Sequence, residues 1–141
     1  MKIFNISILA VDRPFYTGPC ESLIVPSLEG KYGILANHVN TIIAVIPGAL
    51  VYMVPGKENE TVAVSHGFVK VEENNVFVLV DSVERVEDID INRAKRSADA
   101  AREAILQNRS IQEYRAAQAR LARALNRLKV KGEYDNKKKR Y

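Results

Sequence analysis

Hydrophobic and polar residues alternate with a period of two in the first part of the chain. Residues 3–10 (IFNISILA) place Asn5 and Ser7 between apolar neighbours, as in a strand with one buried face. Short runs rich in β-branched residues follow: ESLIVPSLEG, YGILA, ALVYMV, TVAVSHGFVKVE and NVFVLV. They are separated by turn signals, namely Gly18-Pro19, Gly30, Pro47-Gly48, Pro55-Gly56 and Asn74-Asn75. A spacing of roughly 8–12 residues per strand predicts that residues 1–87 form an all-β domain, a sandwich or a barrel.

The period changes to that of a helix near residue 91. Apolar residues then recur at intervals of three and four, at Ile91, Ala94, Ala98, Ala101 and Ile105. Asp88 and Asp90 stand just before this stripe, and aspartate is a preferred N-cap residue. We therefore predict a helix that begins after one of these two aspartates.

A second helix is predicted after an interruption at residues 107–110 (QNRS). Ser110 is a candidate N-cap, and Glu113 completes a capping box. The predicted apolar stripe consists of Tyr114, Ala117, Leu121, Ala124, Leu125 and Leu128. Gly132 is expected to end the helix, which gives a two-helix hairpin over residues 88–131 and a basic, flexible tail over residues 132–141. Because the stripe of the first helix is mostly alanine, we expect a weakly closed hairpin that a ligand or partner could open.

The two parts carry opposite net charge. Residues 1–87 hold 6 Lys/Arg and 10 Asp/Glu, a net charge of −4, whereas residues 88–141 hold 15 and 7, a net charge of +8. This split favours two modules with different partners, the basic one suited to an acidic surface, a phosphate compound or nucleic acid. A nucleic-acid binder would need a helix with base-reading side chains, whereas here basic and acidic residues are mixed. We therefore expect that nucleic acid is not a partner of this chain.

Residues that could carry catalysis are scarce. The chain has one cysteine, Cys20, and two histidines, His38 and His66, without a cluster at metal-ligand spacing. His38 is interpreted as a solvated loop residue, and His66, which precedes Gly67, as part of a bulge or tight bend. EGKYGILANH lacks the Gly-Lys-Ser/Thr ending of a phosphate-binding loop. We therefore expect a protein that is not an enzyme by itself and requires no cofactor.

The arginines of the second helix form a stripe beside its apolar face. Arg120, Arg123 and Arg127 follow one another at i, i+3 and i+7, and Arg93 flanks the first helix in the same way. The stripe is either a solvated basic face or a set of guanidinium groups that converge on a polyanion when the hairpin closes.

The chain resembles the epsilon subunits of bacterial F-type ATP synthases up to about residue 131. The match is carried by EGKYGILANH, by PGAL nine residues later, and then by VAVSHGFVKVEENNVFVLVDS, IDINRA and ALNRL, in this order. The resemblance implies a β-sandwich followed by a two-helix hairpin, in a non-catalytic subunit of the central stalk of a proton-translocating synthase. Such a subunit lies at the cytoplasmic face of the bacterial cell membrane, peripheral and associated with the membrane only through the complex.

The resemblance also implies partners for each module. The sandwich would bind the gamma subunit and rest on the ring of c subunits, with Lys31 and His38 at matching contact positions. Lys31 replaces a frequent carboxylate, and the sequence ANH, with Asn40 after the histidine, replaces a proline-containing pattern. The hairpin would extend along gamma to the acidic lever of a catalytic beta subunit and inhibit ATP hydrolysis.

Some members of this family bind ATP as a regulatory ligand in the closed hairpin, through an Ile/Leu-Asp-x-x-Arg-Ala motif. The resemblance implies that Glu84, Ile89, Asp90 and Ala94 meet adenine and that Arg93, Arg123 and Arg127 meet ribose or phosphates. One arginine of the family pattern is replaced by Ala100, which predicts weaker binding. The alternative is that Asp90 only caps the helix. An alternative for the whole chain is a free-standing ATP-binding sensor.

Overall fold

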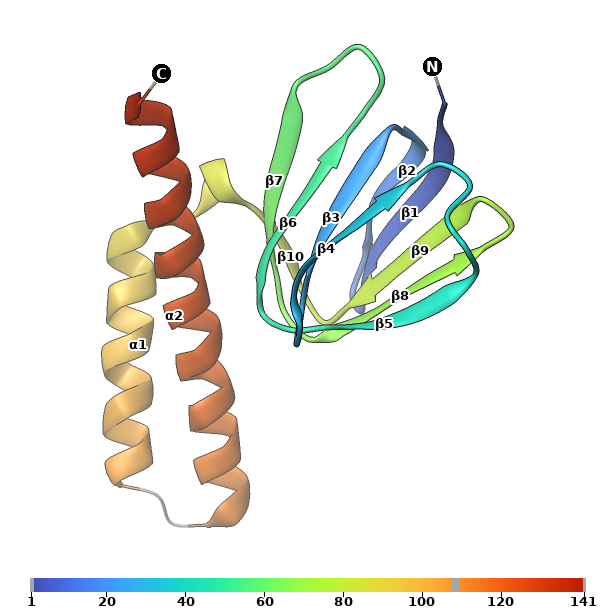
Figure 1. The fold of residues 1–141 in the computed structure, drawn as a ribbon. Coiled ribbons are helices and arrows are strands. Elements are labelled where there is room, and N and C mark those ends of the chain that lie inside the picture. The colour runs from blue at the N-terminus through green and yellow to red at the C-terminus, as the bar shows by residue number, and fades with distance from the viewer. Residues whose placement is uncertain (1, 108–109, 141) are drawn as a thin grey trace. The chain divides into compact units, whose positions relative to one another are not determined.

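A computed structural model describes residues 2–107 and 110–140, and the side chains of residues 2–107 and 110–137. The chain divides into two compact units, residues 1–85 and 86–141, two residues before the predicted boundary. The first unit is a sandwich of two five-stranded sheets, and the second is a helical hairpin (Figure 1). The predicted class, an all-β sandwich followed by an α-helical hairpin, is confirmed.

The strands of the two sheets alternate between buried and exposed residues. The first sheet has the order β2-β1-β9-β8-β5 and the second the order β10-β7-β6-β3-β4. The strands are β1 (Phe4–Ala10), β2 (Pro14–Cys20), β3 (Ser22–Ser27), β4 (Gly30–Leu35), β5 (Thr41–Val45), β6 (Gly48–Met53), β7 (Asn59–Val64), β8 (Gly67–Glu72), β9 (Asn75–Val80) and β10 (Val83–Arg85). In β1, Phe4, Ile6 and Ile8 face the core and Asn5 lies outside, as the period of two predicts.

The core between the sheets consists mainly of valine, isoleucine and leucine. It includes Leu23, Val25, Ile34, Leu50, Val62, Val69, Val76 and Val78, all fully or almost fully buried. β1 pairs with β9 in parallel, whereas the other pairs are antiparallel. The parallel pair brings Asn5 opposite Asn75 and so joins the start of the chain to the turn between β8 and β9.

One turn prediction is corrected by the fold. Gly18-Pro19 was expected to form a turn but lies inside β2, which is possible because β2 is an edge strand, where proline need not donate to a neighbour. The space above Gly18 is filled by the ring of Tyr16, whose hydroxyl donates to the Pro19 carbonyl at 2.9 Å. At His66-Gly67 the chain passes close to β9, since a Cβ on Gly67 would lie 2.0 Å from the Leu79 carbonyl oxygen.

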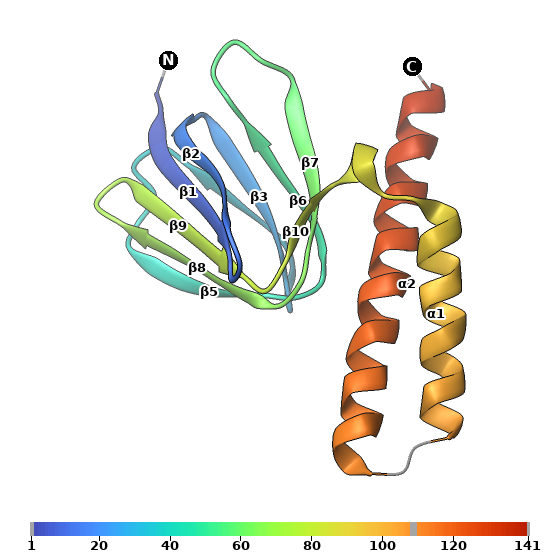
Figure 2. The same cartoon turned by 180° about the vertical axis from the view of Figure 1, so that it is seen from behind.

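The second unit contains two helices that run side by side in both views (Figures 1 and 2). A 3₁₀ turn, η1 (Val86–Asp88), precedes α1 (Ile91–Leu106) and α2 (Ile111–Arg140). The seam is thin, as expected: among the described side chains of the two helices, the buried ones are Ala94, Ala98, Ala101, Ala117, Ala124 and Val130. Leu125, predicted in the stripe, is instead exposed.

The prediction that the second helix ends at Gly132 is wrong, because α2 continues to Arg140. Gly132 is not among the glycines with positive φ, and the flanking Lys131 and Asp135 form an ion pair at 3.7 Å across it. Asn108 and Arg109, in the predicted interruption, and Tyr141, in the predicted tail, lie outside the described residues.

Candidate functional site

Asp90 is the N-cap of α1. Its carboxylate accepts a hydrogen bond from the Arg93 backbone N–H at 3.1 Å, and its carbonyl accepts from the Ala94 N–H at 2.9 Å. The side-chain bond satisfies one of the N–H groups that the first turn of a helix leaves unpaired, and the carbonyl accepts the first hydrogen bond within the helix. The capping interpretation of Asp90 is therefore confirmed, and the side chain remains exposed. Ser110 caps α2 in the same way, accepting from the Glu113 N–H at 3.1 Å.

Arg93, Arg123 and Arg127 lie at a similar height along the hairpin, near the level where α1 begins. Arg93 lies 13 residues before the end of α1, and Arg123 and Arg127 lie 12 and 16 residues after the start of α2. At a rise of about 1.5 Å per residue, Arg93 and Arg123 are at nearly the same height, and Arg127 is about one turn further along.

The three arginines also share one side of the seam. Arg93 and Arg123 each immediately precede a buried seam alanine, Ala94 and Ala124. The two helices of an antiparallel pair are related by a two-fold axis normal to their common plane, so equal offsets from the seam lie on the same side. Arg127, three residues after Ala124, is about 40° from Arg123 around the helix. The predicted set of guanidinium groups therefore flanks one side of the closed hairpin.

The residues proposed to meet adenine are placed less uniformly. Ile89 and Ala94 are only 6% and 3% exposed. Because Ala94 belongs to the seam, a ligand would reach its methyl group only after neighbouring α2 side chains moved. Glu84 is half-buried in β10 opposite Ala63, in the sandwich unit. Ala100, which replaces an arginine of the family pattern, is about 20° from Arg93 around α1. It therefore lies on the same side of the hairpin as the three arginines.

A contact at the end of the hairpin was not predicted from the sequence. The Tyr134 hydroxyl donates to the Glu87 carboxylate at 3.4 Å, joining the last part of α2 to η1. The sequence does not predict this bond, because Gly132 predicts a helix end before Tyr134.

The loop between β4 and β5 holds His38 by both ring nitrogens. The Val39 carbonyl, which can only accept, is 2.8 Å from Nδ1, and the Tyr32 hydroxyl is 3.1 Å from Nε2. The rings of His38 and Tyr32 meet edge to face at 5.6 Å. His38 is thus half-buried and fixed, which corrects its interpretation as a solvated residue, whereas Lys31, on β4 beside Tyr32, is exposed.

Two buried groups of the sandwich have raised pKa values. Burial is the main cause for the Cys20 thiol and for the Tyr52 hydroxyl, so both resist losing their protons. Among the described residues no group of three His, Cys, Asp or Glu side chains is placed to hold a metal ion. Within the described part of the chain, no helix is long and apolar enough to span a bilayer.

Comparisons with known proteins match both units. Residues 3–86 match the family model of the ATP synthase delta/epsilon chain beta-sandwich domain, and residues 87–132 match that of the delta/epsilon chain long alpha-helix domain. The chain is 40% identical over 128 residues to the ATP synthase epsilon chain of Ruminiclostridium cellulolyticum, covering 91% of this chain and 95% of that protein. It is 37% identical over 131 residues to the epsilon chain of Nitratidesulfovibrio vulgaris, covering 93% and 97%.

A solved structure shares the fold. It is a chain in the cryo-EM structure of the Euglena gracilis mitochondrial ATP synthase, OSCP/F1/c-ring in rotational state 1, with a TM-score of 0.71 and 20% identity. The match covers 86% of this chain and 77% of that chain.

Proposed function

The chain belongs to the delta/epsilon family of ATP synthase subunits, and we propose that it acts as a non-catalytic, regulatory subunit of the central stalk in a proton-translocating F-type ATP synthase. The observation that carries this proposal is the match of both units, in order, over residues 3–132. The subunit would be peripheral, at the cytoplasmic face of the bacterial cell membrane. The sandwich would attach the subunit to the complex, and the hairpin would regulate ATP hydrolysis.

The outer face of the first sheet is the proposed contact for the gamma subunit. Phe68 on β8 lies opposite Leu79 on β9, and Phe77 lies opposite Lys70. These three apolar side chains, together with Ile42 on β5, are exposed although they are large. A contiguous exposed apolar patch marks an interaction site in a soluble protein. The loop between β4 and β5, with His38 and the neighbouring Lys31, would contact the c ring.

The hairpin is the proposed inhibitory element. Its unit carries most of the positive charge, which suits an acidic lever of the beta subunit. The five buried alanine methyl groups of the seam contribute only about 4 kcal/mol, at about 0.8 kcal/mol per buried carbon group. Because this contribution is small, the closed hairpin is only weakly favoured. A ligand that binds only the closed form would shift this balance.

ATP is the proposed ligand of the closed form, held at its phosphates by Arg93, Arg123 and Arg127. The support is the shared height and side of these arginines, next to the capping residue Asp90. The affinity should be lower than that of a site with a further arginine, because a hydrogen bond to a charged group is worth about 1.5–3 kcal/mol.

The direct test is ATP titration of the isolated chain by calorimetry. Arg93→Ala and Arg123→Ala should each weaken binding more than tenfold, since each removes a charged hydrogen-bond donor. Arg115→Ala, on an exposed part of α2 near the start of that helix, is the matched control and should leave binding unchanged. Ala100→Arg should tighten binding. Absence of binding at millimolar ATP would leave Asp90 as a helix cap alone.

A further inference from the structure

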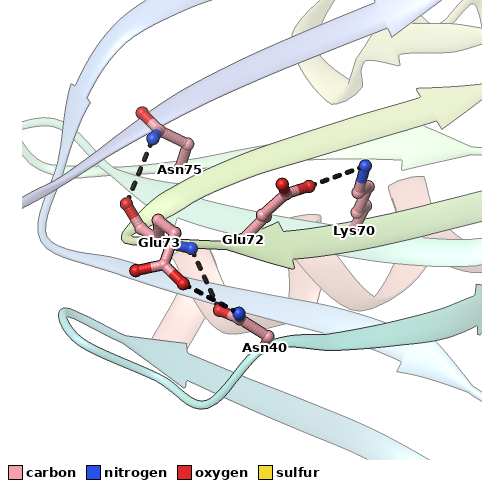
Figure 3. A network of polar contacts seen from close by, with 5 residues as sticks. All are labelled: Asn40, Lys70, Glu72, Glu73 and Asn75. Carbon is pink, nitrogen blue, oxygen red and sulfur yellow. Dashed lines mark hydrogen bonds and ion pairs between the residues drawn. The ribbon is translucent and has the colours of Figure 1, made fainter.

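The loop between β4 and β5 is tied to the turn between β8 and β9 by side-chain hydrogen bonds (Figure 3). Asn40 Nδ2 donates to Glu73 Oε1 at 3.1 Å, and the Glu73 backbone N–H donates to Asn40 Oδ1 at 3.0 Å. The two residues are thus joined in both directions. Lys70 and Glu72, drawn in the same figure, form a separate ion pair along β8 at 2.7 Å.

Asn74 adds a second tie between the same segments. Its Oδ1 accepts from the Asn37 backbone N–H at 2.7 Å, and its Nδ2 donates to the Ile3 carbonyl at 3.1 Å. One amide therefore connects the loop, the turn and the residue before β1. We call Asn40, Glu73 and Asn74 the asparagine clamp.

The clamp holds backbone in a conformation that side chains rarely adopt. The φ angles are 62° at Asn37, 48° at Glu73 and 62° at Asn74, all in the left-handed region. Asparagine tolerates this region better than most residues, whereas glutamate does not, and such residues persist only where their surroundings fix them. The hydrogen bonds of the clamp supply these constraints.

The residue between the anchored positions is Val39. On one side His38 is fixed by Tyr32 and by the Val39 carbonyl, and on the other side Asn40 is fixed by Glu73. Val39 itself exposes 74% of its surface, and Leu35, at the end of β4, exposes 65%. An apolar side chain in solvent, with both neighbours held, suits a contact residue presented in one conformation.

We infer that the asparagine clamp positions Val39 for docking onto the c ring. The inference rests on the proposed contact between this loop and the ring. A loop that is ordered before docking loses less conformational entropy when it binds, so its affinity is higher. Asn40, Glu73 and Asn74 are positioning residues, and Val39 is the residue that touches the partner.

The test measures the affinity of the full chain for the purified c ring and, separately, for the gamma subunit. Asn74→Gly permits the positive φ of the turn but removes both side-chain hydrogen bonds. It should weaken c-ring binding about three- to tenfold, the effect of losing one or two such bonds, and leave gamma binding unchanged. Asn40→Ala should act in the same way.

Two matched variants define the specificity of the effect. Lys70→Ala breaks the neighbouring ion pair without touching the loop and should leave the affinity for the c ring unchanged. Phe68→Ser, on the outer face of the first sheet, should weaken gamma binding and spare the c ring.

A double-mutant cycle separates positioning from simple contact loss. Val39→Ala should weaken c-ring binding in the wild type and weaken it less in the Asn74→Gly background, because a disordered loop presents Val39 poorly. Equal effects in the two backgrounds would overturn the inference, as would clamp variants that lower both affinities together. If the wild-type chain fails to bind the c ring, the proposed ring contact itself is wrong. If it binds and the clamp variants bind equally well, only the positioning role is wrong.

Discussion

Substituting Asp90 by alanine or by asparagine separates helix capping from ligand binding. The alanine variant loses the acceptor of the 3.1 Å bond from the Arg93 N–H, which exposes an unpaired group at the start of α1. Replacing an aspartate cap by alanine costs about 1 kcal/mol, whereas asparagine caps about as well as aspartate. Because the seam of the hairpin buries little apolar surface, this loss of stability should shift the equilibrium toward the open hairpin.

Amide hydrogen exchange of α1 in the isolated chain measures that equilibrium. Asp90→Ala should lower the protection of the α1 amides about fivefold, the factor for about 1 kcal/mol, and Asp90→Asn should lower it less than twofold. If Asp90 also contacts ATP through its charge, Asp90→Asn should still weaken ATP binding more than tenfold. An asparagine variant as poorly protected as the alanine variant would refute the capping argument.

The remaining predictions concern both units. Gly67→Ala should lower the free energy of unfolding of the sandwich, measured by urea denaturation, by about 2–3 kcal/mol, because the new Cβ would meet the backbone of β9. Gly33→Ala should be nearly neutral, because no atom lies within 4 Å of a Cβ at that position. Equal effects of the two substitutions would contradict the packing argument. Cys20 should react slowly with Ellman's reagent at pH 8 in the folded chain and rapidly in urea, because burial protects the thiol and raises its pKa. The folded state therefore binds this proton more tightly than the unfolded state. The contribution of Cys20 to the free energy of unfolding should be present below its ordinary pKa of 9.0 and decline as the pH rises above that value. If a Cys20→Ala variant lost stability at alkaline pH in the same way, another group would be the cause. Ending the chain at Gly132 should remove the circular dichroism signal of the 8 residues of α2 from 133 to 140, and an unchanged signal would show that these residues are not helical in solution.

The strands that the sequence predicts are those in which apolar and polar residues alternate, so that one face packs against the core. β1, β3, β6, β8 and β9 lie against the common core and show the period of two. β2 was missed because Gly18-Pro19 has the local chemistry of a turn, and only its position at the edge of a sheet permits it as strand. The assignment of β2 as a strand depends on its position in the folded sheet, which the local sequence does not show.

The same reason limits what could be predicted of the functional residues. The Asp90 cap and the arginine side follow from local periodicity and were predicted. The link from Asn40 to Glu73 joins residues 33 positions apart through a loop and a turn without sequence periodicity. Gly132 was read as a helix end because glycine costs about 1 kcal/mol relative to alanine inside a helix, but this cost is offset by the buried Val130 and the ion pair of Lys131 with Asp135.

The central claim is that the hairpin restrains ATP hydrolysis while the sandwich keeps the subunit attached. The most direct measurement is ATP hydrolysis by the synthase complex reconstituted with the full chain or with a chain that ends at Arg85, the last residue of the sandwich unit. The account predicts that both chains bind the complex and that hydrolysis is faster with the shortened one. Equal hydrolysis rates with equal occupancy would contradict a regulatory role for the hairpin.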